Sequence, residues 1–267
     1  MTVDGIADYK FIKPMGDAAH GRLYLAHRPA RVPGEGPTVL VKVVEGATDD
    51  AFRRFTRELR AYAAVASPYL VALVDAGQQL DVFFSAREHL PMGTLETPTD
   101  SLDRASSLRA VAHTALAAHA LHEAGIAHRD IRPGNIWLHE SGAKLGDLGL
   151  AQQTEGAANM TTMVSSVRSV AYLDPTSVYG EPGRSGDIYA LGVTLHFALT
   201  GRTVYDDLPD DMLVAMRTIL RTRPRVGAEL SPEEAAVVEV CIAADPADRP
   251  ATAAEVADLI FGLGAPR

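Results

Sequence analysis

The sequence contains a single cysteine, Cys241, among its 267 residues. One cysteine cannot build an intrachain disulfide framework, which favours a reducing compartment. Long apolar runs are also missing, because no window approaches the roughly 18 uninterrupted apolar residues of a membrane span, and the N-terminus lacks an apolar stretch of signal-peptide length. These absences predict a cytoplasmic chain with no membrane segment.

Positive charge is scarce, since 25 Lys and Arg residues face 34 Asp and Glu residues for a formal net charge of −9. Proteins that bind nucleic acid concentrate positive charge on the surface that contacts phosphates, so we expect no nucleic-acid partner. The hydrophobic share of 47% and the charged share of 22% are close to globular averages. Composition therefore predicts a globular chain with a sizeable core, made of one large domain or two small ones.

The first ninety residues are typical of β structure. Short segments rich in β-branched and aromatic residues predict strands at 9–12, 22–26, 38–43, 70–75 and 81–86. One helix is predicted over 50–66, because its apolar residues recur at the helical spacings of three and four: Phe52, Phe55, Leu59, Tyr62 and Ala66. The Gly- and Pro-rich stretch 31–37 is predicted to be a hairpin loop.

Beyond about residue 95 the pattern becomes helical. Helices are predicted at 106–123, 187–199, 232–244 and 252–263. The second of these is apolar on nearly every face, which is typical of a buried helix. The predicted fold class is α+β, with a small antiparallel β lobe that carries one helix and a larger, mainly helical lobe.

The most informative string is HRDIRPGN, which runs from His128 to Asn135 and is followed twelve residues later by Asp147 in the string DLG. Asp147 and Asn135 offer the hard oxygen ligands that Mg²⁺ prefers. Asp130 offers a carboxylate that can accept a proton. A loop of solvated polar residues is the alternative interpretation of HRD taken alone, and the fixed position of Asn135 argues against it.

With these motifs the sequence resembles the eukaryotic-type (Hanks-type) protein kinase superfamily, and it is most similar to bacterial Ser/Thr protein kinases. The resemblance runs from about Tyr9 to Leu263. It implies the bilobal protein kinase fold in a single domain over 1–267, with an N-lobe at about 9–90 and a C-lobe at about 91–263.

The resemblance also implies the roles of the residues that handle phosphate. Lys42, which ends the string TVLVK, is implied to contact the α- and β-phosphates of ATP, and Glu58 is implied to pair with it. A surface pair with Arg54 is the alternative for Glu58. Asp130 would accept the hydroxyl proton, and Arg132 would steady the transferred γ-phosphoryl group.

The same resemblance assigns the metal and nucleotide sites. Asn135 and Asp147 are the implied ligands of Mg²⁺ or Mn²⁺. The string from Gly16 to Leu23 resembles the phosphate-covering loop, although alanine replaces its middle glycine. The residues implied to bind ATP are Gly16, Ala18, Gly21, Leu23, Leu40, Lys42, Glu88, Leu90 and Trp137.

Several positions depart from the family pattern. Leu40 and Trp137 are larger than the usual residues against the base, so we expect a narrowed nucleotide pocket. Arg132 replaces a lysine, which keeps the charge but changes its shape. Thr176 replaces the glutamate of the A-P-E motif, so we expect the usual ion pair with Arg249 to be lost.

One further residue and one segment also match the family. Asp187 matches the helix aspartate that holds the HRD backbone in relatives. The segment from Asp147 to about Pro175 resembles an activation segment, and we expect it to be autophosphorylated within Thr161–Ser166.

The implied function is ATP-dependent, Mg²⁺-assisted transfer of a phosphoryl group to a protein serine or threonine. The resemblance names ATP as a partner and leaves the protein substrate and the oligomeric state open. One alternative is a pseudokinase that acts as a binding or regulatory module with little ATP turnover. Another is a small-molecule phosphotransferase, which the HRD arginine and the long activation segment argue against.

Overall fold

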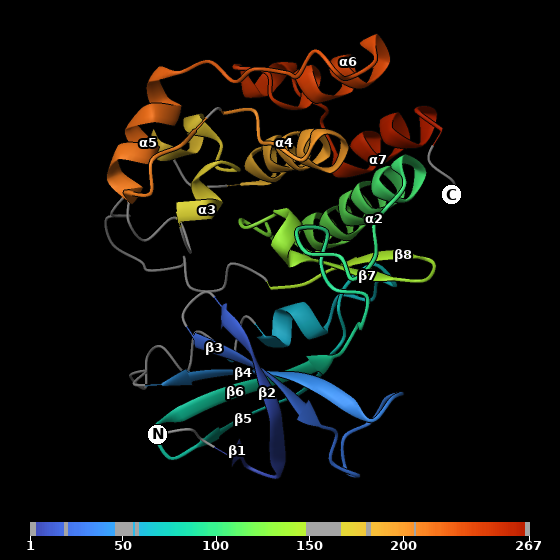
Figure 1. The fold of residues 1–267 in the computed structure, drawn as a ribbon, viewed down its shortest axis with the longest axis vertical. Coiled ribbons are helices and arrows are strands. Elements are labelled where there is room, and N and C mark those ends of the chain that lie inside the picture. Colours follow the sequence, from blue (N-terminus) through green and yellow to red (C-terminus); the bar gives the residue numbers. More distant parts are fainter. Residues whose placement is uncertain are drawn as a thin grey trace. The chain divides into compact units, whose positions relative to one another are not determined.

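The structure is a computed structural model that describes residues 4–18, 21–45, 56, 59–147, 167–179, 183–205 and 207–264. The chain divides into two compact units. The first comprises Met1–Ala66 and Val71–Leu90, and the second comprises Ser67–Leu70 and Pro91–Arg267. Figure 1 shows the ribbon of both.

The first unit is built on a six-stranded antiparallel sheet with the order β1-β2-β3-β4-β6-β5. Its strands are β1 (Gly5–Ile6), β2 (Tyr9–Ala18), β3 (Gly21–His27), β4 (Thr38–Glu45), β5 (Leu73–Gln79) and β6 (Val82–Glu88). The predicted loop 31–37 joins β3 to β4, and these strands form the expected antiparallel hairpin. The guanidinium of Arg28 fastens this loop by donating to the carbonyls of Pro33, Glu35 and Gly36.

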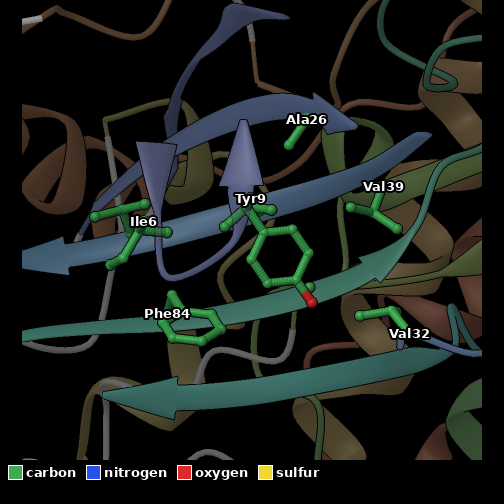
Figure 2. Close-up of a cluster of buried hydrophobic side chains, with 9 residues drawn as sticks. Ile6, Tyr9, Ala26, Val32, Val39 and Phe84 are labelled. Carbon is green, nitrogen blue, oxygen red and sulfur yellow. The ribbon is translucent and has the colours of Figure 1, made fainter. Parts of the chain in front are cut away.

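Alternation along the strands gives this sheet its core. The buried cluster consists of Ile6, Tyr9, Ala26, Val32, Val39, Val41, Val43, Phe84 and Ala86. Odd-numbered positions of β4 and even-numbered positions of β6 contribute to it, as a period of two requires. Figure 2 shows the Tyr9 ring beside Phe84, and the two rings meet edge to face with centroids 5.6 Å apart.

The helix predicted over 50–66 is described only in part. Residue 56 and residues 59–63 are helical. Leu59 and Tyr62 are buried, as the spacing predicts, and the Tyr62 hydroxyl donates to the carbonyl of Val71 at 2.6 Å. Phe52, Phe55 and Glu58 lie outside the described residues.

The second unit is mainly helical. Its helices are α2 (Arg104–Glu123), α3 (Val167–Val170), α4 (Arg184–Thr200), α5 (Met212–Arg221), α6 (Pro232–Cys241) and α7 (Ala253–Gly262). Single 3₁₀ turns lie at Pro133–Asn135, Pro175–Tyr179 and Pro246–Asp248. Helix α2 packs against α4, α7 and a hairpin of β7 (Ile136–His139) and β8 (Gly142–Leu145).

Local signals explain where these helices begin. Helix α6 opens with a capping box in which Ser231 and Glu234 each bond the other's backbone N–H. Residues 187–196 of α4 are all buried, as their apolar character predicts. Helix α5 was not predicted from the sequence. Within the described residues, no helix has the length and apolar character needed to cross a membrane.

Candidate active site

The backbone of the HRD string is fixed by a carboxylate from α4. Asp187 Oδ2 accepts the N–H of His128 at 2.7 Å, and its Oδ1 accepts the N–H of Arg129 at 2.8 Å. Arg129 has a φ of 68°, which non-glycine residues rarely adopt, so these bonds offset local strain. His122 Nε2 lies 2.7 Å from the same carboxylate. The predicted anchoring role of Asp187 is confirmed.

Asp130 and Asn135 are hydrogen-bonded to each other, and a further bond brings the neighbour of Asp147 to the same assembly. The Asn135 amide nitrogen donates to the Asp130 carbonyl at 2.7 Å and to its carboxylate at 3.0 Å. The N–H of Gly146 donates to the Asn135 carbonyl at 2.9 Å. Asp147 follows Gly146 directly and is thereby brought to the loop that carries Asp130. Asp130 itself is 7% exposed.

The buried His128 ring links the two ends of this assembly. Its Nε2 lies 3.0 Å from the Gly146 carbonyl, which only accepts, and its Nδ1 accepts the Asp130 N–H at 3.3 Å. Burial lowers the pKa of His128, while the carboxylates of Asp187, Asp130 and Asp147 act in the opposite direction. A neutral ring protonated at Nε2 satisfies both contacts. The imidazole thus contacts both the HRD loop, at Asp130, and the segment before Asp147, at Gly146.

Asn135 and Asp147 suit a hard divalent cation. Because the Asn135 amide nitrogen faces Asp130, the amide oxygen is the group that it can offer to a metal. Among the described residues, no three His, Cys, Asp or Glu side chains are grouped so that they could hold a metal by themselves. Mg²⁺ commonly takes one or two protein ligands and completes its shell with phosphates and water. The donor set fits that kind of ion.

Arg132 belongs to a chain of charges that the sequence did not reveal. Its Nε lies 3.6 Å from Asp130 Oδ1, and its Nη1 lies 3.5 Å from Glu96 Oε2. Glu96 Oε1 lies 3.4 Å from Nη1 of Arg168. The pKa of Tyr172 is raised mainly by burial and further by the charge of Glu96. No sequence motif marks Glu96, which lies in a turn far from HRD along the chain.

The predicted nucleotide residues of the first unit lie on its strands, except Leu90, which follows β6. Lys42 is half-buried on β4, where its partners in register are Leu23 and Ser85. Leu40 is 1% exposed on the same strand. Glu88 ends β6, and its carboxylate accepts the N–H of Ala72 at 2.6 Å. Leu90, half-buried, closes this unit.

The glycines of the phosphate-loop string serve the β2–β3 hairpin. Gly16 has a φ of 117°, a backbone conformation that disfavours other residues. Gly21 lies against the Val43 carbonyl so closely that a side-chain carbon would collide with it. Ala18 pairs with Gly21 in register. Residues 19 and 20 at the tip lie outside the described residues.

Two predicted site residues remain to be placed. Trp137 is 6% exposed on β7, and its backbone forms an isolated antiparallel β-bridge with Thr94. Glu58, and with it the expected pair with Lys42, lies outside the described residues.

Thr176 offers no carboxylate to Arg249, as expected, but Arg249 still has an ion-pair partner. Arg249 Nη1 lies 2.6 Å from Asp174 Oδ2, and both side chains are almost fully buried. Thr176 donates its N–H and its hydroxyl to the same carboxylate at 2.9 and 2.8 Å. Asp174, two residues before the missing glutamate, supplies the carboxylate, because the Asp-Pro-Thr turn points it inward.

A small cavity of about 30 Å³ joins the HRD loop to this turn. Its lining includes Arg129, Asp130, Ser169, Tyr172, Asp174 and Asp187. Such a volume exceeds the space that one water needs, and the polar lining offers partners for it. The loop that carries Asp130 and the turn that carries Asp174 therefore line the same small pocket.

Comparison with known families gives one clear match, to the protein kinase domain over residues 9–260. The chain belongs to the protein kinase family. The sheet of the first unit and the helices of the second are the two lobes of the α+β kinase fold, so the predicted fold class is confirmed. Kinases of this family use ATP and a divalent metal.

Several bacterial proteins are similar to this kinase. It is 31% identical over 267 residues to the serine/threonine-protein kinase PknK of Mycobacterium tuberculosis, with 94% of this chain and 23% of that protein covered. It is 31% identical over 270 residues to AfsK of Streptomyces coelicolor, with 97% and 33% covered. It is 33% identical over 240 residues to PknB of Mycolicibacterium smegmatis, with 83% and 38% covered.

The names of these relatives agree with one another. All three are named serine/threonine-protein kinases, and none of the comparisons favours a pseudokinase. The chain spans between about a quarter and two fifths of the length of these relatives. The predicted resemblance to the protein kinase superfamily, and to its bacterial serine/threonine members, is confirmed.

Proposed function

We propose that this chain transfers the γ-phosphoryl group of Mg²⁺·ATP to a serine or threonine hydroxyl of a protein. The assembly of Asp130, Asn135 and Asp147 carries this proposal. It joins a buried proton acceptor to Asn135, and Asn135 to Gly146, the neighbour of Asp147, through hydrogen bonds of 2.7 to 3.0 Å. Phosphoryl transfer needs positioning and charge stabilisation more than covalent chemistry, and this assembly supplies both.

Each residue then has a role in the proposed reaction. Asp130 accepts the proton of the attacking hydroxyl. Arg132, whose Nε lies 3.6 Å from that carboxylate, steadies the γ-phosphoryl group. Lys42, for which the resemblance implies a pair with Glu58, would hold the α- and β-phosphates. Asn135 and Asp147 would hold Mg²⁺, which would supply positive charge that offsets the charge of the phosphates.

The other untested assignments are part of the same proposal. We assign 1–267 to a single kinase domain, with the lobes at about 9–90 and 91–263. ATP would be contacted by Gly16, Ala18, Gly21, Leu23, Leu40, Glu88, Leu90 and Trp137 as well as Lys42. A cytoplasmic location stays a prediction that rests on the single cysteine.

The experiment is a phosphate-transfer assay with γ-labelled ATP, with the chain itself and a generic basic protein as acceptors. Asp130→Asn removes the proton acceptor and should lower transfer by about 10²-fold or more. Asp100→Asn, which changes an exposed aspartate of the same unit, is the matched control and should leave transfer unchanged. Nucleotide binding by the wild-type chain without any transfer would favour the pseudokinase instead.

A further inference from the structure

Glu96 is a charged residue beside the catalytic loop that no motif assigns. Each of its carboxylate oxygens faces a different arginine, Arg132 at 3.5 Å and Arg168 at 3.4 Å. The Glu96 side chain is 30% exposed and that of Arg132 is 19% exposed, whereas that of Arg168 is 80% exposed. Partial burial makes the pair with Arg132 the less screened of the two.

The backbone fixes Glu96 at this place. Its neighbour Leu95 donates an N–H to the Ile136 carbonyl at 2.9 Å, and the N–H of Leu138 donates to the Gly93 carbonyl at 2.9 Å. The turn is closed by the N–H of Thr97, which donates to the Thr94 carbonyl at 3.1 Å. The segment that carries Glu96 is therefore bonded to the strand that follows Asn135, rather than resting on the surface as a free loop.

A glycine makes room for the contact. A side-chain carbon at Gly134 would collide with Nη1 of Arg132 and with Oε2 of Glu96. The φ of Gly134 is not in the left-handed region, so backbone conformation does not require glycine there. The Arg132 and Glu96 side chains therefore fill the volume that a side chain at position 134 would need.

We propose that Glu96 is a positioning residue that holds the outer edge of the Arg132 guanidinium while Asp130 faces the inner edge. The proposal rests on the proposed function, which gives Arg132 the γ-phosphoryl contact. A guanidinium is planar with donors on both edges, so two carboxylates can fix its plane. Without Glu96, the Arg132 side chain could change its rotamer or pair with both carboxylate oxygens of Asp130. The second arrangement would leave Asp130 less able to accept the substrate proton.

The main test is a double-mutant cycle with purified full-length chain. Glu96→Gln should lower kcat about tenfold and leave the KM values for ATP and for protein within twofold, because small misplacement of a catalytic group costs turnover. In an Arg132→Lys background the same change should have no further effect, since the shorter point charge does not bridge to Glu96. Glu229→Gln, which breaks the exposed pair with Arg202, is the matched control.

Three results would overturn the proposal. An equal loss in both backgrounds would mean that Glu96 does not act through Arg132. A raised KM for the protein substrate with unchanged kcat would make Glu96 a substrate contact. An equal loss in Arg168→Ala would mean that Glu96 acts by anchoring α3.

A steric variant tests the same contact with every charge retained. Gly134→Ala should push the Arg132 and Glu96 side chains apart and reduce kcat as Glu96→Gln does, with an unchanged Tm, because flexible side-chain ends can move at little cost. Full activity of Gly134→Ala would contradict the proposal.

A readout without turnover separates this proposal from the proposed function. The Nε–Hε resonance of Arg132, assigned by its absence in Arg132→Lys, should show restricted motion in the nucleotide-free chain. Glu96→Gln should make it mobile and Arg168→Ala should not. If the wild-type chain transfers no phosphate, the proposed function fails, and the NMR comparison still decides whether Glu96 positions Arg132. Equal mobility in wild type and Glu96→Gln would refute that positioning.

Discussion

At the scale of single residues, the two aspartates of the site should fail in different ways. Asp147→Asn removes a hard ligand and is expected to weaken Mg²⁺·ATP binding at least tenfold, because a neutral amide replaces an anionic oxygen. Asp130→Asn should keep nucleotide affinity within a few-fold, because Asp130 is bonded to Asn135 rather than assigned to the nucleotide. A thermal-shift titration with Mg²⁺·ATP measures both, since binding to the native state raises Tm. Identical affinities in the two variants would contradict these roles.

A second residue-scale effect concerns a buried histidine away from the site. His113 of α2 is 7% exposed and packs 4.7 Å from the Tyr69 ring. Burial, together with the nearby positive charges of His139 and Arg109, lowers the pKa of His113 to about 4. The unfolded chain therefore binds this proton more readily than the folded chain does between about pH 6.5 and 4.

The sign of the pH effect follows from that difference. Keeping His113 neutral and buried favours the folded chain fully above about pH 6.5, and this contribution is lost as pH falls toward 4, by about 3 kcal/mol at most. Urea unfolding at pH 7 and pH 4.5 measures it. His113→Phe keeps an apolar ring against Tyr69 and should lose less stability over this interval. If the free energy of unfolding of His113→Phe falls between pH 7 and pH 4.5 as much as that of the wild type, other groups cause the acid sensitivity.

At the scale of elements, the Asp174–Arg249 pair joins the 3₁₀ turn at Pro175–Tyr179 to the segment after α6. Breaking a buried pair leaves an unpaired charge and costs about 3–5 kcal/mol, so Asp174→Ser should lower the free energy of unfolding by that order. Thr176→Glu added to Asp174→Ser restores the family pattern and should recover a large part of the loss. Denaturant unfolding tests this, and no recovery in the double variant would mean that the turn presents only position 174 to Arg249.

Helices with strong local signals were predictable from the sequence, and elements stabilised by their neighbours were less so. The capped and apolar segments α4 and α6 appear where the pattern placed them. Helix α5 was missed, although Asp211 caps it by accepting the Val214 N–H at 2.9 Å. Strand β5 spans Leu73–Gln79 instead of 70–75, and it extends into polar residues because this edge strand pairs with β6 through its backbone.

The same distinction holds for the site. The strings that carry Asp130, Asn135 and Asp147 are compact, and their assembly was predictable from resemblance. Glu96 and Asp174 act through contacts with residues distant in the chain. A side chain that gains its role from a partner brought near by folding leaves no local pattern to detect.

At the scale of the whole molecule, residues 167–177 contact other parts of the second unit, to which they belong, at several points. Arg168 contacts Glu96, and Asp174 contacts Arg249. Beside them, Nε of Arg129 is buried and has no hydrogen-bond partner among the described residues. The stretch 148–166, which includes Thr161 and Thr162, lies outside the described residues. Arg129 is thus a cation that a phosphate on that stretch would suit.

We therefore expect autophosphorylation within Thr161–Ser166, with Thr161 and Thr162 favoured. A phosphothreonine carries nearly two negative charges and three strong acceptors, so it would pair with Arg129 and order the activation segment. Peptide mass spectrometry after incubation with Mg²⁺·ATP should find phosphate there, and Thr161→Ala/Thr162→Ala should lower transfer to an added protein about tenfold or more. Thr99→Ala, which changes an exposed threonine, is the control. Full activity of the double variant, or phosphate only at other sites, would show that ordering of the segment does not depend on these threonines, because the contacts of Arg168 and Asp174 would then suffice.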